Sequence, residues 1–365
     1  MSSEILFLFL AGLSIFFAAD KFLAIHDFLR LAFAAGLAFA VAIIVKKEIL
    51  PIKFVLGLIA VAAVAESLLG LGQFLKQSDL GLQFLGEPVL SSEISGVAKI
   101  VVDGAKIVRA YGTFTHPNIL AAFLILGLIS LYYFWLALSA NNESGTNKRI
   151  FRYLLVSLSL LIILVGLVTT FSRTGWLIAA LITLILLRKH WRKLLLVGAM
   201  AAVLVLIFNS YVFARARIDS EEPAVNLRWT YNKIGWEIIK QHPFFGIGIG
   251  NQVSYAISNG LYQKYGLEQE WQQQAIHNLY LLIAAEVGVV GLLVFIIFLI
   301  ALLLGVGSST FGGRPTTNIQ HPTIKAMLAA LLLFGMTDHF LWTQREGILM
   351  LWLATGILVG VSSAR

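Results

Sequence analysis

The sequence predicts an all-α, polytopic integral membrane protein with about ten transmembrane helices. Of its 365 residues, 59% are hydrophobic and only 13% are charged, whereas soluble domains carry about 25% charged residues. Several apolar runs are also long enough to cross the hydrocarbon core, which takes about 17–25 helical residues. Finally, Lys and Arg residues gather in alternate short connections, as expected for loops on the cytoplasmic side. We expect residues 1–365 to form a single transmembrane domain.

The apolar runs define ten expected helices, of which the sixth and tenth are short for a span. No basic residue precedes the first run, which disfavours a cleaved signal peptide and favours a retained first span. The expected spans are 4–19, 28–45, 54–75, 118–138, 151–171, 174–188, 194–213, 277–303, 324–343 and 347–362.

Cationic residues set the expected orientation. About half of the 27 Lys and Arg residues lie on one side of the expected membrane, in segments 46–53, 141–152, 188–193 and 304–325 (with Arg314 and Lys325) and at Arg365. The positive-inside rule therefore places both termini in the cytoplasm and the long segments 76–117 and 214–276 outside. Attraction to anionic lipid accounts for the net charge of +8, so we expect membrane lipids rather than nucleic acid as partners.

Each long outer segment contains a regular element. In the first, apolar residues alternate around Asp103-Gly104, a pair typical of the type I′ turn of a β-hairpin. In the second, an apolar stripe at helical spacing predicts an amphipathic helix near the outer membrane surface. The stripe consists of Leu227, Tyr231, Ile234 and Ile238, between a possible cap at Asn226 and the terminating His242-Pro243.

The residues present exclude several kinds of chemistry. The chain has no cysteine, so it has no thiol nucleophile, disulfide or metal thiolate. No carboxylate-rich outer motif, GxSxG or Walker sequence occurs, and we expect neither a metal nor a cofactor. The segment "HPFFGIGIGN" (242–251) has three alternating glycines that permit close backbone approach, but it is not a dinucleotide fingerprint.

Polar residues gather where the expected spans meet the outer face. Arg173 lies in a turn between two spans, Arg228 lies on the amphipathic helix, and His277-Asn278 begins a long apolar run. Each has a simpler alternative: a snorkelling arginine, a surface cation or a helix cap. A histidine can also act as a base near neutral pH, and a guanidinium binds phosphate through two hydrogen bonds. Together they suit group transfer from a phosphorylated donor at the outer face.

Other polar and small residues suit a structural role. Glu286 lies nine residues beyond His277, about 13 Å along a helix, and we expect it to pair with a buried polar group of another span. Gly288 and Gly291 permit another helix to approach closely. A further polar pair lies near the outer end of the ninth span, Asp338 and His339.

These motifs resemble the O-antigen ligase and O-antigen polymerase superfamily of bacterial membrane glycosyltransferases. The ligase pattern is His, then Asn, Ser or Gln, nine residues, Gly, two residues, and Gly, Thr or Tyr; His277-Asn278, Gly288 and Gly291 fit it throughout. The segments "RAYGTFTHPNILAAF", "FSRTGW" and "HPFFGIGIGN" also resemble family segments, in the expected order.

The resemblance implies an inverting, metal-independent transfer of a glycan from a polyprenyl (undecaprenyl) diphosphate to an acceptor hydroxyl. The reaction would occur at the outer face of the bacterial cytoplasmic (inner) membrane. By motif, Arg173 and Arg228 would engage the diphosphate and His277 would serve as the base. The candidate substrate-binding residues are Arg109, His116, Asn251 and Asn278.

Several functions stay open at this stage. Within the superfamily, the acceptor could be a glycan, a lipid A-core or a protein, so the enzyme could be a ligase, a polymerase or a protein O-oligosaccharyltransferase. Two other classes are a transporter or flippase and a non-catalytic assembly partner. A transporter requires polar residues or broken helices at mid-membrane in both halves, whereas Glu286 is nearly alone at that depth.

Overall fold

The computed structural model describes residues 3–140, 146–217, 223–305 and 320–363. Arg314 and Arg365, which contribute to the expected cytoplasmic charge, lie outside these residues. The chain divides into two compact units. The first comprises Met1–Lys46, Asp219–Pro315 and Leu331–Arg365, and the second comprises Lys47–Ile218 and Thr316–Ala330.

Helices dominate the described residues. The N-terminal part of the chain contains α1 (Ser3–Ser14), α2 (Lys21–Lys46), α3 (Ile52–Lys76), the strands β1 (Lys99–Val102) and β2 (Ala105–Val108), α4 (Pro117–Ala140), α5 (Thr146–Thr169), α6 (Arg173–Leu187), α7 (Trp191–Ile207) and α8 (Asn209–Ala216). The remainder contains α9 (Pro223–Gln241), α10 (Gln252–Ser258), α11 (Leu261–Lys264), α12 (Leu279–Leu304), α13 (Gln320–Gly335), α14 (Phe340–Thr343) and α15 (Arg345–Ser363).

The all-α polytopic membrane fold is confirmed, but the number of spans is not. Within the described ranges, six helices are long and apolar enough to cross a membrane: α2, α3, α4, α5, α12 and α15. Three other predicted spans correspond to shorter apolar helices, at Ser3–Phe17, Arg173–Leu187 and Pro322–Gly335. The predicted helix 194–213 is not straight, because α7 and α8 meet at an angle of 93°. A total of ten therefore stays a prediction.

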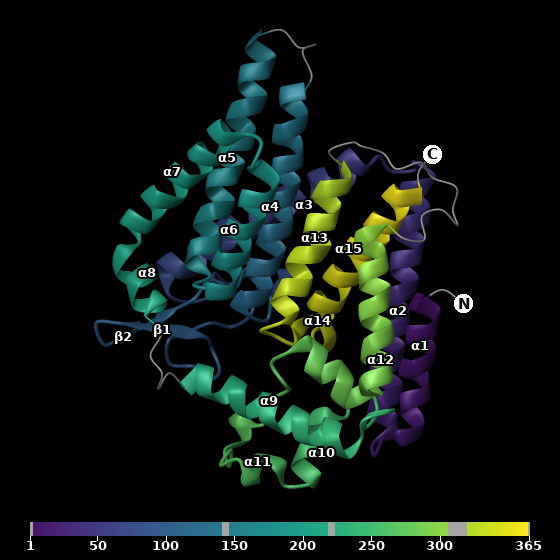
Figure 1. Cartoon of the computed structure of the whole chain (residues 1–365). Helices are drawn as coiled ribbons and strands as arrows, with labels where there is room; N and C mark the ends of the chain where they lie inside the picture. The colour runs from purple at the N-terminus through teal and green to yellow at the C-terminus, as the bar shows by residue number, and fades with distance from the viewer. Residues whose placement is uncertain (1–2, 141–145, 218–222, 306–319, 364–365) are drawn as a thin grey trace. The chain divides into compact units, whose positions relative to one another are not determined.

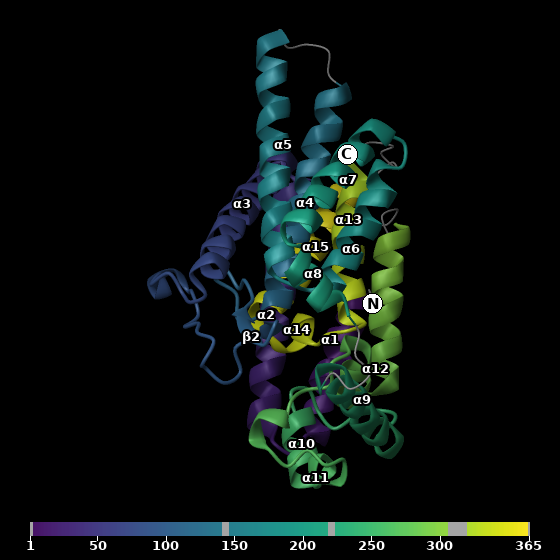
Figure 2. The same cartoon turned by 90° about the vertical axis from the view of Figure 1, so that its left-hand side faces the viewer.

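The second unit is built around α4, which packs against α3, α5 and α6 (Figures 1 and 2). In an apolar stretch of 18 residues within α4, 89% of the residues are buried inside the protein. Small residues let the helices approach closely, since Gly127 of α4 contacts Ala63 and Gly166 of α5 contacts Ser67. Outward-facing side chains remain apolar, as at Val61 (69% exposed), which is the pattern expected of surfaces that face lipid.

The predicted hairpin is confirmed in the second unit. Strands β1 and β2 are antiparallel, with Val102 opposite Ala105. The turn residues Asp103 and Gly104 have φ values of 50° and 82°, and positive φ at both central positions defines a type I′ turn. Ile100 anchors the hairpin in an aromatic cluster with Phe74 and Phe171. On which side of a membrane the hairpin lies stays a prediction.

In the first unit, α2 packs along α15, and α1 packs along α12. The predicted amphipathic helix is α9, which lies across the start of α12 (Figure 1). Its stripe is buried inside the protein, with Tyr231 2% exposed and both Ile234 and Ile238 0% exposed. Trp229 and Trp236 on the same helix are exposed. The apolar stripe of α9 therefore packs against protein, whereas the two indole side chains point to the outside of the protein.

Candidate active site

A break in the middle of α12 shapes the site. Gly288 has φ 86° and ψ 167°, which is not helical, and a side chain there would collide with the carbonyl group of Phe244. The amide of Val289 donates a hydrogen bond to the carbonyl oxygen of Pro243 (2.8 Å) instead of to its own helix. A loop, rather than a second helix, therefore occupies the space that Gly288 provides.

The same loop satisfies the carbonyl groups that the break leaves free. The amides of Ile247 and Gly248 donate to the carbonyl oxygens of Ala285 (3.0 Å) and Glu286 (2.9 Å). The three alternating glycines of the loop, Gly246, Gly248 and Gly250, have φ values of 67°, 94° and 75°. Residues with a side chain rarely adopt such positive φ values. Glycine therefore lets the loop backbone lie directly against α12.

The buried carboxylate of Glu286 fastens the end of this loop. Glu286 is 3% exposed, and its oxygens accept hydrogen bonds from the amides of Gly250 (2.9 Å) and Gln252 (3.2 Å). The indole N–H of Trp342 donates a further bond (2.7 Å). A buried carboxylate with three donors is well satisfied, so Glu286 acts as a structural clamp between α12, α14 and the loop.

Asn251, a candidate substrate-binding residue, is fully engaged within this loop. Its side-chain oxygen accepts a bond from the amide of Asp20 (2.9 Å). Its side-chain amide donates to the carbonyl oxygens of Asp20 and Ile249, both at 3.1 Å. Asn251 is 0% exposed. In this arrangement, Asn251 joins the loop to the connection after α1.

Asn278 caps the start of α12. Its side-chain oxygen accepts hydrogen bonds from the amides of Tyr280 and Leu281, both at 3.0 Å. Its side-chain amide donates to the carbonyl oxygen of Met336 (3.0 Å). An N-cap of this kind contributes about 1 kcal/mol to helix stability. Asn278 therefore fixes the position of the residue before it, His277.

His277 has a defined tautomer. Its Nδ1 lies 2.9 Å from the carbonyl oxygen of Ala275. A carbonyl oxygen can only accept a hydrogen bond, so Nδ1 carries the proton and Nε2 of the neutral ring keeps its lone pair. This is the state in which an imidazole can take a proton from a hydroxyl group.

Aromatic neighbours hold the His277 ring. It stacks on Tyr231 of α9, with ring centroids 5.0 Å apart and planes 16° apart. The ring of His339 meets it edge to face at 4.7 Å. His339 Nδ1 lies 2.6 Å from the hydroxyl of Thr343, and the carboxylate of Asp338 accepts a bond from the amide of His339 (2.8 Å). The polar pair of the ninth predicted span therefore lies beside His277.

Burial is the main cause that lowers the pKa of His277, from 6.5 to about 4. Smaller effects from His339 and Arg228 act in the same direction, while the charge of Asp338 raises the pKa. Burial also lowers the pKa of His339. His277 is therefore neutral near pH 7, and Asp338 favours the imidazolium that forms when the ring accepts a proton.

The charge of Arg228 lowers the pKa of both His277 and His339. Arg228 lies three residues before Tyr231 on α9, so the two share a helix face. Its side chain is half-buried. Over the described ranges, no hydrogen bond or ion pair engages its guanidinium group. Arg228 is thus a cation that an anionic ligand could bind.

Arg173 belongs to the second unit, where it is the first residue of α6. Ser172 caps that helix by accepting a hydrogen bond from the amide of Gly175 (3.2 Å). A helix N-terminus carries partial positive charge, which the Arg173 side chain reinforces. Arg173 is half-buried.

Two further candidates of the second unit have structural contacts. Arg109 is 5% exposed, and its guanidinium donates to the carbonyl oxygen of Thr170 (2.7 Å) and to the side chain of Asn118 (3.1 Å). His116 Nδ1 accepts a bond from the amide of Asn118 (3.1 Å). Arg109 and His116 therefore connect the hairpin, the start of α4 and the end of α5.

Sequence reasoning gave no role at the site to Tyr231 or to the pair Asp338-His339. In the sequence, Tyr231 was assigned only to the apolar stripe of the amphipathic helix. Its position three residues after Arg228 nevertheless predicts that both side chains lie on the same face of that helix. Asp338 and His339 are far from His277 in sequence. Their signal was the presence of ionisable residues at the end of an apolar run.

Comparison with known proteins finds one matching family model. Residues 158–296 match the family model described as O-antigen ligase. This match supports the resemblance to the O-antigen ligase superfamily. The matched region contains Arg173, Arg228 and His277 and ends inside α12. The match points to a multi-pass bacterial membrane enzyme of glycosyltransferase type, whose general partners are a lipid-linked glycan and an acceptor. No curated protein matches the chain.

Proposed function

We propose that this protein transfers a glycan from a polyprenyl diphosphate to an acceptor hydroxyl at the outer face of the bacterial cytoplasmic membrane. The observation that carries this proposal is the state of His277. Its Nδ1 donates its proton to the Ala275 carbonyl oxygen, 2.9 Å away, which leaves Nε2 able to accept a proton. Among the described residues, none forms a hydrogen bond or ion pair with Arg228, whose charge acts on this ring.

The proposed reaction is a single inverting displacement. Nε2 of His277 takes the proton of the acceptor hydroxyl, and the acceptor oxygen forms a bond to the anomeric carbon. The bond between that carbon and the diphosphate oxygen breaks, and its electrons leave with the polyprenyl diphosphate. The diphosphate is a stable anion, so the leaving group requires no strong acid.

The arginines have distinct proposed roles in this reaction. Arg228 would bind the diphosphate through parallel hydrogen bonds, because its guanidinium matches phosphate geometry. Arg173, at the positive end of α6, is assigned to the diphosphate by its motif. Asp338 would stabilise the imidazolium of His277 after proton transfer, by the charge effect that raises the pKa of that ring.

A reconstituted assay tests the proposal. Purified protein is mixed with an undecaprenyl-diphosphate-linked glycan and a labelled acceptor, with a chelator present. We expect the label to enter a product of increased mass, with loss of the donor. A glycan, a lipid A-core and a peptide are supplied as alternative acceptors. Movement of donor across a vesicle membrane without a new glycosidic bond would instead support a flippase.

A further inference from the structure

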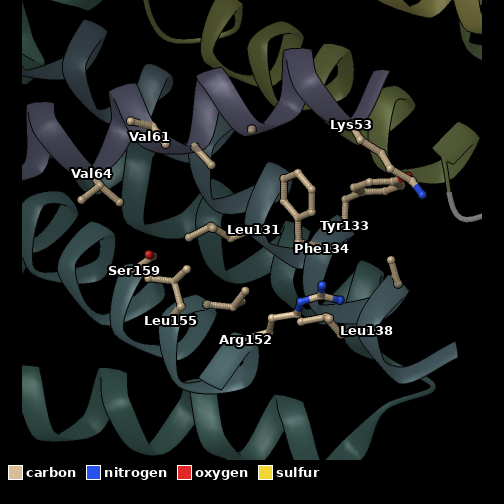
Figure 3. Close-up of a pocket in the computed structure, with 14 residues that line it drawn as sticks. Lys53, Val61, Val64, Leu131, Tyr133, Phe134, Leu138, Arg152, Leu155 and Ser159 are labelled. Atoms are coloured by element: carbon tan, nitrogen blue, oxygen red, sulfur yellow. The ribbon is translucent and has the colours of Figure 1, made fainter. Parts of the chain in front are cut away.

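A groove in the second unit is lined by none of the candidate active-site residues. Helices α3, α4 and α5 enclose a space of about 600 Å³ (Figure 3), within the range of about 300–1,000 Å³ typical of ligand pockets. Its walls are mainly apolar, with Val64 from α3, Leu131 and Phe134 from α4, and Leu155 from α5. The groove is therefore suited to a hydrocarbon chain.

Two cations stand at one end of this groove. Lys53 begins α3 and Arg152 lies in the second turn of α5, so they approach from opposite walls (Figure 3). Both side chains are exposed. In the part of the chain that the structure describes, neither makes a hydrogen bond or an ion pair. Their charges are thus available to an anion at the mouth of an apolar space.

The position of the groove fits one leaflet of a membrane. Lys53 and Arg152 belong to the basic segments 46–53 and 141–152, which the positive-inside rule places at the cytoplasmic surface. From Lys53 to Val64, the apolar wall extends for about 16 Å along α3, about half of the roughly 30 Å hydrocarbon core. A lipid with its headgroup at the cytoplasmic surface would place its chains along this wall.

We propose that the groove binds an anionic glycerophospholipid of the cytoplasmic leaflet. Its phosphate would lie between Lys53 and Arg152, and an acyl chain would lie against α3, α4 and α5. Arg152 can bind the phosphate through two hydrogen bonds, while Lys53 adds a point charge. The proposal does not depend on glycan transfer, whose lipid-linked donor is expected to react at the opposite membrane face.

A second apolar groove provides an internal comparison. It lies between α5, α6 and α7, has a volume of about 370 Å³, and no charged residue lines it. Acyl chains can occupy such a surface without any preference for the headgroup. A preference for anionic lipid is therefore assigned to the groove that contains Lys53 and Arg152.

Native mass spectrometry of the full chain in detergent tests the proposal. Phosphatidylglycerol and phosphatidylcholine with identical acyl chains are titrated separately. We expect the first phosphatidylglycerol to bind more tightly than phosphatidylcholine. The double variant Lys53→Gln/Arg152→Gln should lose about 30-fold in phosphatidylglycerol affinity, from about 1 kcal/mol for each cation. The matched control Arg188→Gln/Lys189→Gln removes two exposed cations from the expected cytoplasmic side and should retain the preference.

Two further variants keep the test decisive. The exchange Lys53→Arg/Arg152→Lys conserves the charge and should retain the preference even if the glutamine pair does not fold. Gly57 lines the groove, and a Cβ atom there would meet only Phe134, at 3.8 Å. Gly57→Leu should therefore fill the groove and weaken phosphatidylglycerol binding without a change in charge.

Three results would overturn the proposal. The first is equal affinity of the wild-type protein for phosphatidylglycerol and phosphatidylcholine. The second is an equal loss of affinity in the Arg188/Lys189 control, which would indicate a general effect of surface charge. The third is displacement of phosphatidylglycerol by a lower concentration of polyprenyl phosphate, which would assign the groove to the carrier lipid instead.

Discussion

Two ionisable side chains near the same helix have opposite environments. Glu286, in the middle of α12, is closed in by three hydrogen-bond donors from the loop and from α14. His277, just before α12, keeps one ring nitrogen free to accept a proton, while its other nitrogen donates to Ala275. The comparison teaches that depth and charge alone do not identify a reactive group. A reactive group needs a lone pair or a proton that is not already used in a hydrogen bond to the protein.

The largest expected effect is loss of activity when His277 is replaced. If it is the general base, His277→Ala should lower turnover by about 10²–10⁴-fold, while donor binding survives through the arginines. His277→Gln should be nearly as inactive, because an amide cannot take the proton. Turnover and donor affinity are measured with the reconstituted assay, with His190→Ala as the control. Near wild-type turnover in His277→Gln would assign the residue to packing.

Glu286 should show the reverse behaviour, with a large effect on stability. Glu286→Ala would leave three buried donors without an acceptor, at about 1–3 kcal/mol each. We expect a clear drop in the thermal unfolding midpoint, which is measured by tryptophan fluorescence in detergent. The exposed Glu268 provides the matched control, Glu268→Ala. An unchanged midpoint in Glu286→Ala would remove the clamp assigned to this carboxylate.

The arginines should be intermediate. Arg228→Lys keeps the charge but loses the paired hydrogen bonds to a diphosphate, so we expect a loss of about tenfold or more in kcat/KM. Arg173→Lys should act in the same direction. Arg217 is an exposed arginine of the expected outer segment 214–276, which also contains Arg228. Arg217→Lys should have no effect. Wild-type kinetics in both Arg173→Lys and Arg228→Lys would refute the diphosphate contacts.

The smallest effect concerns pH. Because the pKa of His277 is about 4, kcat/KM should be nearly constant from pH 6 to 8 and should fall only as pH approaches about 4. A bound diphosphate favours the imidazolium, so the acid limb of kcat should lie at higher pH than that of kcat/KM. The same lowered pKa predicts that the folded state loses stability as pH falls from 6.5 towards 4, because the unfolded chain binds the proton more readily. A kcat/KM midpoint near 6.5 would show that His277 is not buried in the free enzyme.

Local sequence patterns predicted much of the fold. The hairpin at Asp103-Gly104 and the helix through Tyr231 followed from turn chemistry and helical periodicity. The break at Gly288 did not, because it depends on hydrogen bonds between α12 and a loop about forty positions earlier. The 93° bend between α7 and α8 also lies within a continuous apolar run, where hydropathy carries no information about direction.

The site was predictable only in part, for a similar reason. The motif pattern selected His277, Arg228 and Arg173, since each stands at the end of an apolar run or on an amphipathic helix. The placement of His339 beside His277 arises from two segments some sixty positions apart, and no periodicity connects them. The bonding of Asn251 also depends on the distant Asp20. Sequence composition cannot distinguish such a fully bonded amide from one that binds a substrate.

The loop that enters α12 also constrains how the chain is assembled in a membrane. The carbonyl groups of Ala285 and Glu286 accept hydrogen bonds from the loop amides, and an unsatisfied backbone group in hydrocarbon costs several kcal/mol. The loop precedes α12 in the chain, so it is synthesised first. It can form its hydrogen bonds to α12 only after the helix has been synthesised. We therefore expect α12 to partition from the translocation channel together with its loop. Biogenesis would then involve a preassembled loop–helix pair rather than an independent hydrophobic span.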